Sequence, residues 1–206
     1  MEFSDTFEIE GVTTEEAWLA LSDPVLIEEC LPGCQFLVRV EDVGEDPDEV
    51  DFDALAEEAD GEEKPPTLPE ADPDDVAARA FEESGRYATL VGIQVGSVNP
   101  SFETIVTITK REFPEMHASA EGGSSSSSFE LDSGMILSET DDGVEVDWWA
   151  ETDVFGKVAR MGQRVMNPVA NQVVNRFFSD VEDRISEVDD ESSSFRERVR
   201  DVVSRG

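Results

Sequence analysis

Two cysteines and the only histidine are the sulfur and imidazole side chains in this sequence that could bind a metal such as zinc or take part in nucleophilic catalysis. Cys30 and Cys34 lie four positions apart, a spacing that suits two metal ligands on one face of a helix. Pro32 and Gly33 lie between them and break that helix, and His117 is far along the chain. Because a closed zinc site takes a full tetrahedral set of nitrogen and sulfur ligands, we expect structural cysteines, no metal, no cofactor, and a histidine at the surface or a sheet edge.

No catalytic signature surrounds these residues. The sequence has no Ser–His–Asp spacing, phosphate-binding glycine loop or dinucleotide fingerprint. The small polar run Gly122–Ser128 does not lie between a strand and a helix, as a phosphate loop does. Glu145 and Asp147 fall on the outer side of a predicted strand, where they form a hydrated surface. We therefore expect that the protein is not an enzyme and has no catalytic residues.

Acidic residues dominate the composition. The formal net charge is −35, from 50 Asp and Glu against 15 Lys and Arg, although 38% of the residues are hydrophobic and can build an ordinary core. So many like charges repel one another unless salt screens them. At 1 M salt the Debye screening length is about 3 Å. Because the acid is spread along the whole chain, we interpret it as adaptation of a halophilic protein to a salt-rich cytoplasm. An acidic partner-binding surface is the alternative.

The same composition disfavours several classes of protein. A nucleic-acid partner requires a basic face, which this chain does not offer. The sequence has no run of roughly 18 apolar residues to span a bilayer, and its beginning lacks the basic-then-apolar pattern of a secretory signal. Two cysteines do not make a secreted disulfide scaffold. We expect a cytoplasmic protein that is at most peripheral to the inner face of the membrane.

The first forty residues predict a strand, two short helices and a second strand. Residues 1–11 alternate between apolar and acidic side chains, as a half-buried strand does. Thr13 and Glu16 stand at capping-box spacing and open a short helix. Pro24 suits the first turn of the second helix, and residues 34–40 predict the second strand.

Residues 42–83 form an acidic, proline-bearing insert between the second and third strands. We predict helical turns near Phe52–Ala59 and Pro73–Phe81. Elsewhere the insert has too little apolar surface to offset its ordering entropy. We interpret it as a solvated insertion, with an adaptor for a partner as the alternative.

Alternation of inward-facing residues from residue 84 onward predicts five further strands. The one at Met116–Ala120 is expected to be short, and Gly122–Ser128 to form a turn and a strand edge. Asp142 and Gly143 are a hairpin signal. The last strand has an acid at nearly every outer position, so that face of the sheet should meet water.

After the last strand the apolar spacing changes to steps of three and four residues. This spacing predicts one helix of roughly 30 residues that ends at Ile185, and Pro168 should kink it. Residues 187–206 form a tail in which the segment 195–206, if helical, is basic and amphipathic. Such a segment would dock on an anionic membrane or an acidic partner, and a frayed end of the chain is the alternative. We therefore divide the chain into a single domain, 1–186, and this tail.

The order of elements is a strand, two short helices, six more strands and a long helix, which indicates an α+β fold. It resembles the helix-grip fold of the START-like, or SRPBCC, superfamily, in which a curved seven-stranded antiparallel sheet wraps around a long C-terminal helix. Within it, Phe7–Cys34 is similar to the start of proteins of the CoxG family, named after the CoxG subunit of carbon monoxide dehydrogenase. The likeness is strongest in the run Cys30-Leu-Pro-Gly-Cys34. The resemblance covers about residues 1–41 and 84–184.

This resemblance implies an accessory protein. Members of the family are encoded with molybdenum hydroxylases of the carbon monoxide dehydrogenase type. They are associated with recruiting that enzyme to the membrane and with binding a quinone or similar apolar ligand in the grip cavity. The implied partners are therefore an apolar small molecule, a quinone or a lipid, and molybdenum hydroxylase subunits.

Apolar residues that are predicted to face inward from both the sheet and the helix are the candidate cavity lining. Methionine and aromatic side chains suit an adaptable pocket, although an interaction module with a filled core is an alternative. A cyclase- or dehydratase-like enzyme would need polar groups inside, and the sequence offers only Thr89, Thr104, Ser133 and Thr152. The predicted ligand-binding residues are Phe36, Val91, Ile93, Phe102, Val106, Met135, Trp148, Met161 and Val165.

Overall fold

The computed structural model describes residues 1–40, 50–61, 63–94, 99–185 and 193–205. Within these ranges the helices and strands follow the predicted order. They are β1 (Glu2–Glu10), α1 (Thr14–Leu21), α2 (Pro24–Cys30), β2 (Cys34–Arg39), α3 (Phe52–Ala59), α4 (Pro73–Arg79), β3 (Arg86–Gly92), β4 (Ser101–Glu112), β5 (Glu115–Ser124), β6 (Ser127–Glu139), β7 (Gly143–Gly156), the 3-10 turn η2 (Ala159–Met161), α5 (Gln163–Ile185) and α6 (Ser193–Val203).

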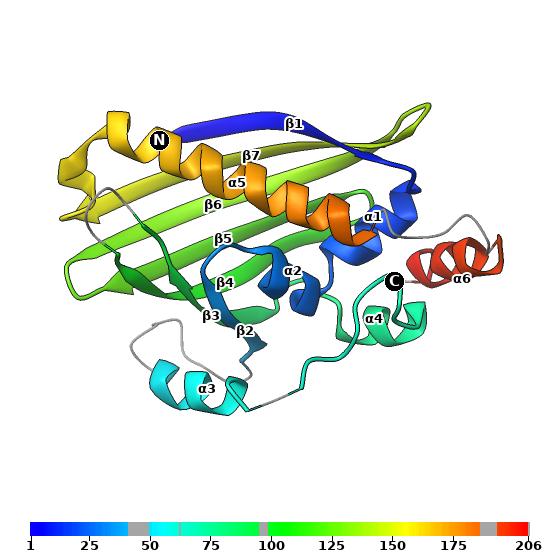
Figure 1. Cartoon of the computed structure of the whole chain (residues 1–206), viewed down its shortest axis with the longest axis horizontal. Coiled ribbons are helices and arrows are strands. Elements are labelled where there is room, and N and C mark those ends of the chain that lie inside the picture. Colours follow the sequence, from blue (N-terminus) through cyan, green and yellow to red (C-terminus); the bar gives the residue numbers. More distant parts are fainter. Residues whose placement is uncertain (41–49, 62, 95–98, 186–192, 206) are drawn as a thin grey trace.

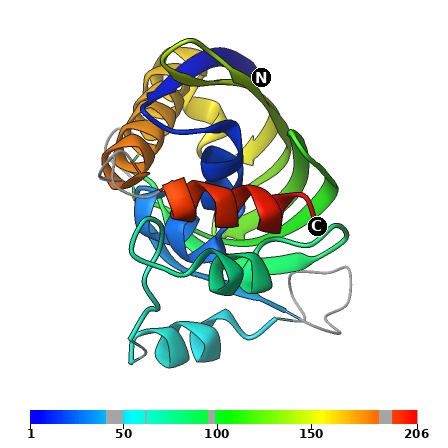
Figure 2. The same ribbon diagram turned by 90° about the vertical axis from the view of Figure 1, so that its right-hand side faces the viewer.

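The seven strands form one antiparallel sheet in the order β1-β7-β6-β5-β4-β3-β2. The sheet is strongly curved, and α5 runs across its concave side (Figure 1). Viewed from one end, the strands wrap around the side that holds α1 and α5 (Figure 2). This arrangement confirms the predicted α+β helix-grip fold with its long C-terminal helix.

Local signals in the first forty residues act as predicted. The Thr13 N–H donates to Glu16 Oε2 (2.7 Å) and the Glu16 N–H donates to Thr13 Oγ1 (3.2 Å), which completes the capping box of α1. Asp23 caps α2 by accepting from the Val25 N–H (3.0 Å). Gly33 turns the chain into β2 with a φ of +82°, and a Cβ there would lie 2.0 Å from a main-chain oxygen of β3. Only glycine fits this turn.

Two predicted boundaries are wrong. β5 does not end near Ala120 but continues to Ser124, and the turn into β6 lies at residues 125–126. Gly122 lies within the strand, opposite Phe129 on the neighbouring strand. A glycine is required there because a Cβ would lie 2.4 Å from the Phe129 ring. The hairpin signal at residues 142–143 does join β6 to β7.

The long helix begins later than its apolar stripe suggests. Gly162 has a φ of +76° and separates the turn η2 from α5, which starts at Gln163. Val158 and Met161 therefore precede the helix, although both still pack in an apolar cluster with Val165. Hydrophobic spacing alone does not detect such a break, because the turn keeps these side chains on the inner side.

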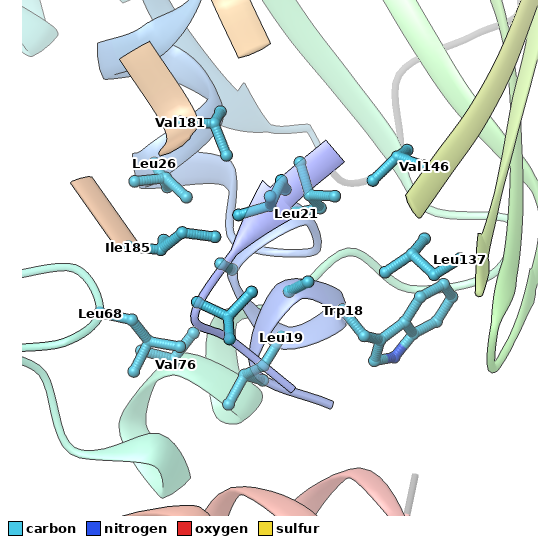
Figure 3. Packing of buried hydrophobic residues seen from close by; sticks show 14 of the residues in the cluster. Trp18, Leu19, Leu21, Leu26, Leu68, Val76, Leu137, Val146, Val181 and Ile185 are labelled. Carbon is cyan, nitrogen blue, oxygen red and sulfur yellow. The ribbon is translucent and has the colours of Figure 1, made fainter. Parts of the chain in front are cut away.

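Three apolar clusters hold the fold together. The largest joins α1, α2, α4, α6 and the end of α5 to the sheet. Figure 3 shows Leu21 of α1 between Val181 and Ile185 of α5 on one side and Leu137 and Val146 of the sheet on the other. A second cluster packs α3 onto β2, β3 and β4. A third lies at the other end of α5, between its first turns, η2 and the sheet.

The insert is not simply a solvated loop, so that interpretation is wrong for part of it. Helices α3 and α4 form close to where they are predicted. Phe52 of α3 is buried against Phe36 of β2, with ring centroids 6.4 Å apart. Leu68 and Val76 lie in the largest cluster. A few apolar residues at the right positions are enough to anchor an otherwise acidic segment.

A buried ion pair ties α4 to the junction between α1 and α2. The Arg79 guanidinium donates to both carboxylate oxygens of Asp23, at 2.8 and 2.6 Å, and also to the main-chain oxygen of Pro66 (2.7 Å). The Asp23 side chain is 1% exposed. Bidentate geometry of this kind offsets the cost of burying the charges only while both partners are present.

The C-terminal helix α6 docks on α1 and α4 instead of remaining a frayed end. Its apolar side, Phe195, Val199 and Val202, is buried, and Val199 belongs to the largest cluster. Three of its arginines pair with carboxylates of the protein itself, whereas docking of the tail on a membrane or a separate partner stays a prediction. The pairs are Arg196–Glu16 (3.4 Å), Arg198–Asp72 (2.7 Å) and Arg200–Glu15 (3.3 Å).

Replacing Arg79 with alanine should lower the free energy of unfolding by about 3–5 kcal/mol, because Asp23 would stay buried without its cation. Urea denaturation measures this loss. Arg205→Ala is the control, since its ion pairs with Asp74 and Asp201 lie at the surface, where pairs contribute little. Equal stability losses in the two variants would show that the buried pair has no special role.

Candidate ligand-binding cavity

An apolar cavity of about 350 Å³ lies between α5 and the concave side of the sheet. Side chains on β4, β5, β6 and β7 form its floor, and residues 173–178 of α5 form its roof. One wall comes from α2 and the turn after it, and Phe81 closes a corner. The volume lies at the small end of the range of roughly 300–1,000 Å³ that is usual for ligand pockets.

α5 is packed more tightly at its ends than in its middle. Val165 and Val169 pack in the third cluster at the start of the helix, and Val181 and Ile185 are fully buried at its end. Between them, Phe178 is buried and stacks on Phe7, with ring centroids 4.9 Å apart. Val173 and Phe177, by contrast, are only partly buried and border the cavity.

Three of the nine predicted ligand-binding residues, Val106, Met135 and Trp148, line this cavity. Their role in ligand binding stays a prediction. Four others lie between sheet and helix but in the filled third cluster, and Val91, on β3, is outside the lining. These four residues are Ile93, Phe102, Met161 and Val165.

Phe36 does not belong to this set. It is fully buried on the opposite, convex side of the sheet, under Phe52 of α3. The β-bulge between Cys34 and Phe36 shifts the register of β2, and the next residue, Leu37, lines the cavity instead. Alternation in the sequence does not show which side chains of β2 face the cavity. The insert covers the outer side of this strand with apolar residues, so both of its sides are apolar.

Sequence reasoning missed much of the wall and roof. Val173 and Phe177 lie on the predicted apolar stripe of the long helix, so their position was recoverable from spacing alone. Ile27 and Leu31 come from the second short helix and its end, and Phe81 comes from the end of the insert. No local pattern in these last segments points to a cavity, because only the closure of the sheet brings them there.

The polar side chains of the lining are already committed to main-chain partners. Thr89 Oγ1 donates to the Phe36 oxygen (2.7 Å), and Ser133 Oγ donates to the Ala118 oxygen (3.3 Å). His117 contributes to the floor from β5, but Met116 and Ala118 on either side of it face inward, so its ring points outward. There it packs edge-on against Trp149, and its Nε2 lies 2.7 Å from Glu115 Oε1.

Both cysteines are free thiols beside the cavity. Burial raises the pKa of Cys30 to about 11 and that of Cys34 to about 11. Cys34 Sγ donates to the Phe36 oxygen and lies 3.3 Å from Thr89 Oγ1. Among the residues that the structure describes, no group of three or more His, Cys, Asp or Glu is placed to hold a metal ion. The arrangement therefore suits binding of an apolar molecule better than acid–base or metal chemistry.

The family model for the CoxG subunit of carbon monoxide dehydrogenase matches residues 79–186, just over half of the 206-residue chain. The chain belongs to the CoxG family. The matched residues include α5 and the five strands β3 to β7, and thus the floor and roof of the cavity. The run Cys30–Cys34 lies outside the matched range, so its likeness to this family stays a prediction. No curated protein matches the chain.

Solved structures share the fold across nearly the whole chain. A conserved protein from Geobacillus kaustophilus is 20% identical, with a TM-score of 0.64, and the match covers 91% of this chain and 96% of that one. A protein from Chromobacterium violaceum is 7% identical, with a TM-score of 0.54 over 90% and 97%. One from Thermus thermophilus is 8% identical, with a TM-score of 0.54 over 89% and 96%. At these identities the likeness concerns the fold alone.

In the described part of this CoxG-family chain, no helix is both long and apolar enough to cross a membrane. The longest, α5, carries charged side chains along its outer side, including Arg176, Asp183 and Arg184. Its apolar side is turned toward the sheet.

Thiol labelling should follow the raised pKa values of the two cysteines. At pH 8 native protein should react slowly with a disulfide reagent, and the rate should rise roughly tenfold per pH unit up to about pH 11, because the thiolate is the nucleophile. Urea should make both thiols react quickly at pH 8. Single Cys30→Ser and Cys34→Ser variants assign the two rates. Fast labelling of folded protein at pH 8 would contradict the inert role of these thiols.

Proposed function

We propose that this protein is a non-catalytic accessory protein of a molybdenum hydroxylase of the carbon monoxide dehydrogenase type. It binds an apolar ligand, a quinone or a lipid, beneath α5 and assists in recruiting the enzyme. The cavity is the observation that carries this proposal: about 350 Å³ of apolar space in a family of accessory subunits. Membership and fold together suggest a non-catalytic accessory role.

The two alternatives receive less support. A cyclase- or dehydratase-like enzyme needs polar groups that act on a substrate, but the hydroxyls of Thr89 and Ser133 are bonded to the main chain. Of the other two polar candidates, Thr104 Oγ1 donates to the Phe102 oxygen and Thr152 Oγ1 to the Glu130 oxygen. An interaction module with a filled core does not account for the apolar cavity of about 350 Å³ that Val173 and Phe177 line.

Menaquinone-4 should quench the fluorescence of Trp148 saturably, because this side chain lines the cavity. The titration is best done in a Trp18→Phe, Trp149→Phe background, which leaves Trp148 as the one tryptophan of the three in the sequence. Ala118→Phe should abolish the quenching by filling the cavity. Ser119→Phe is the matched control, because the adjacent strand position faces the convex side. Non-saturable quenching, or equal quenching in both variants, would count against the proposal.

Peripheral membrane contact through the tail would require α6 to leave its site on α1 and α4. Intact protein should therefore float weakly with vesicles of phosphatidylglycerol and phosphatidylcholine. A free peptide of residues 193–205 should float more strongly, because its apolar side is no longer covered. The peptide with Arg198→Glu and Arg200→Glu is the control for charge attraction. Flotation of the intact protein as strong as that of the peptide would show that α6 undocks at a membrane.

A further inference from the structure

The hydroxyl and thiol groups around the cavity beneath α5 have no hydrogen left to donate, so the indole N–H of Trp148 is the side-chain donor that remains in the described lining. The Thr89 hydroxyl donates to Phe36 and the Ser133 hydroxyl to Ala118, both to main-chain oxygens. The thiol of Cys34, beside Thr89, also donates to the Phe36 oxygen. His117 turns its ring to the other face of the sheet, toward Glu115 and Trp149.

The main chain around the cavity is equally committed. The strands of the floor, β4 to β7, each have an antiparallel neighbour on both sides, so their N–H groups bond within the sheet. The N–H groups of residues 173–178 lie inside α5 and bond within the helix. In the described part of the chain, the lining therefore offers a ligand almost only hydrocarbon contact.

An apolar lining has different effects on the binding of the polar headgroup and of the hydrocarbon chain of an amphiphile. A quinone carbonyl or a lipid headgroup placed inside would lose its hydrogen bonds to water and gain none, which weakens affinity by roughly tenfold for each buried polar group. Each methylene placed inside strengthens affinity by about fourfold. Together these effects favour binding of the ligand's hydrocarbon chain, and not of its polar ring, inside the cavity.

We propose that the cavity takes the hydrocarbon chain of an amphiphile, an acyl or isoprenoid chain, and leaves the polar headgroup outside. This inference rests on the proposed function, because it specifies the chemistry of the same ligand site. The ring of a quinone ligand would then lie beyond the apolar lining, where water or a second protein reaches it.

Three probes test the two proposals separately in the intact chain: menaquinone-4, menadione, which is the same ring without a chain, and straight-chain alcohols from octanol to tetradecanol. Trp148 fluorescence reports binding in the Trp18→Phe, Trp149→Phe background. Affinity for the alcohols should rise about fourfold per methylene until the 350 Å³ are filled and then level off. Menadione should bind at least a hundredfold more weakly than menaquinone-4.

The outcomes separate the proposals. Menadione binding as tightly as menaquinone-4, without chain-length dependence among the alcohols, would overturn this inference and leave ligand binding intact. Binding by none of the probes would overturn the proposed function together with it. In Ser133→Ala, which removes a lining hydroxyl, the ratio of the affinities for menaquinone-4 and tetradecanol should stay within about twofold. A tenfold fall in this ratio would show that a polar group recognises the ring and would overturn this inference.

Discussion

Helix α5 is held to the protein by its two ends, and the cavity depends on this constraint. Val181 and Ile185 are locked among α1, α2 and the sheet, while the first turns pack with Phe102 and Val158 at the far end of the grip. A helix fixed in this way bridges the concave surface of the sheet, and only part of its middle, chiefly Phe178, packs on the strands. The cavity is the space that remains between this bridging helix and the curved sheet.

The end of α5 is stable only because other segments complete its surroundings. Arg79 joins α4 to Asp23, between the two short helices, and α6 then covers α1 and α4 together. The insert and the tail lie apart in the sequence, yet both support the same end of the cavity. Accordingly, the insert and the tail, which do not look essential in the sequence, contribute to the ligand site through the helices that they pack against.

The sequence predicted most of the fold, because its signals are local. The Thr13–Glu16 capping box, Pro24 and the alternation of the strands each specify structure within a few residues. The site was harder to predict. Alternation shows which side chains of a strand point into the cavity only if the opposite side of the sheet is polar. Phe36 was misassigned because α3 makes the convex side apolar too. Phe81 and Ile27 were missed because their approach to the cavity depends on tertiary closure.

The open sheet has two outermost strands, β1 and β2, and each must avoid pairing with another molecule. β2 is short and carries a bulge, which interrupts any added ladder. β1 is long and regular, but Glu2, Asp5, Glu8 and Glu10 line it, so like charges oppose the approach of a second copy. That repulsion weakens as salt rises. The colloidal behaviour of the protein therefore depends on β1, where ionic strength sets how strongly edge-to-edge association is resisted.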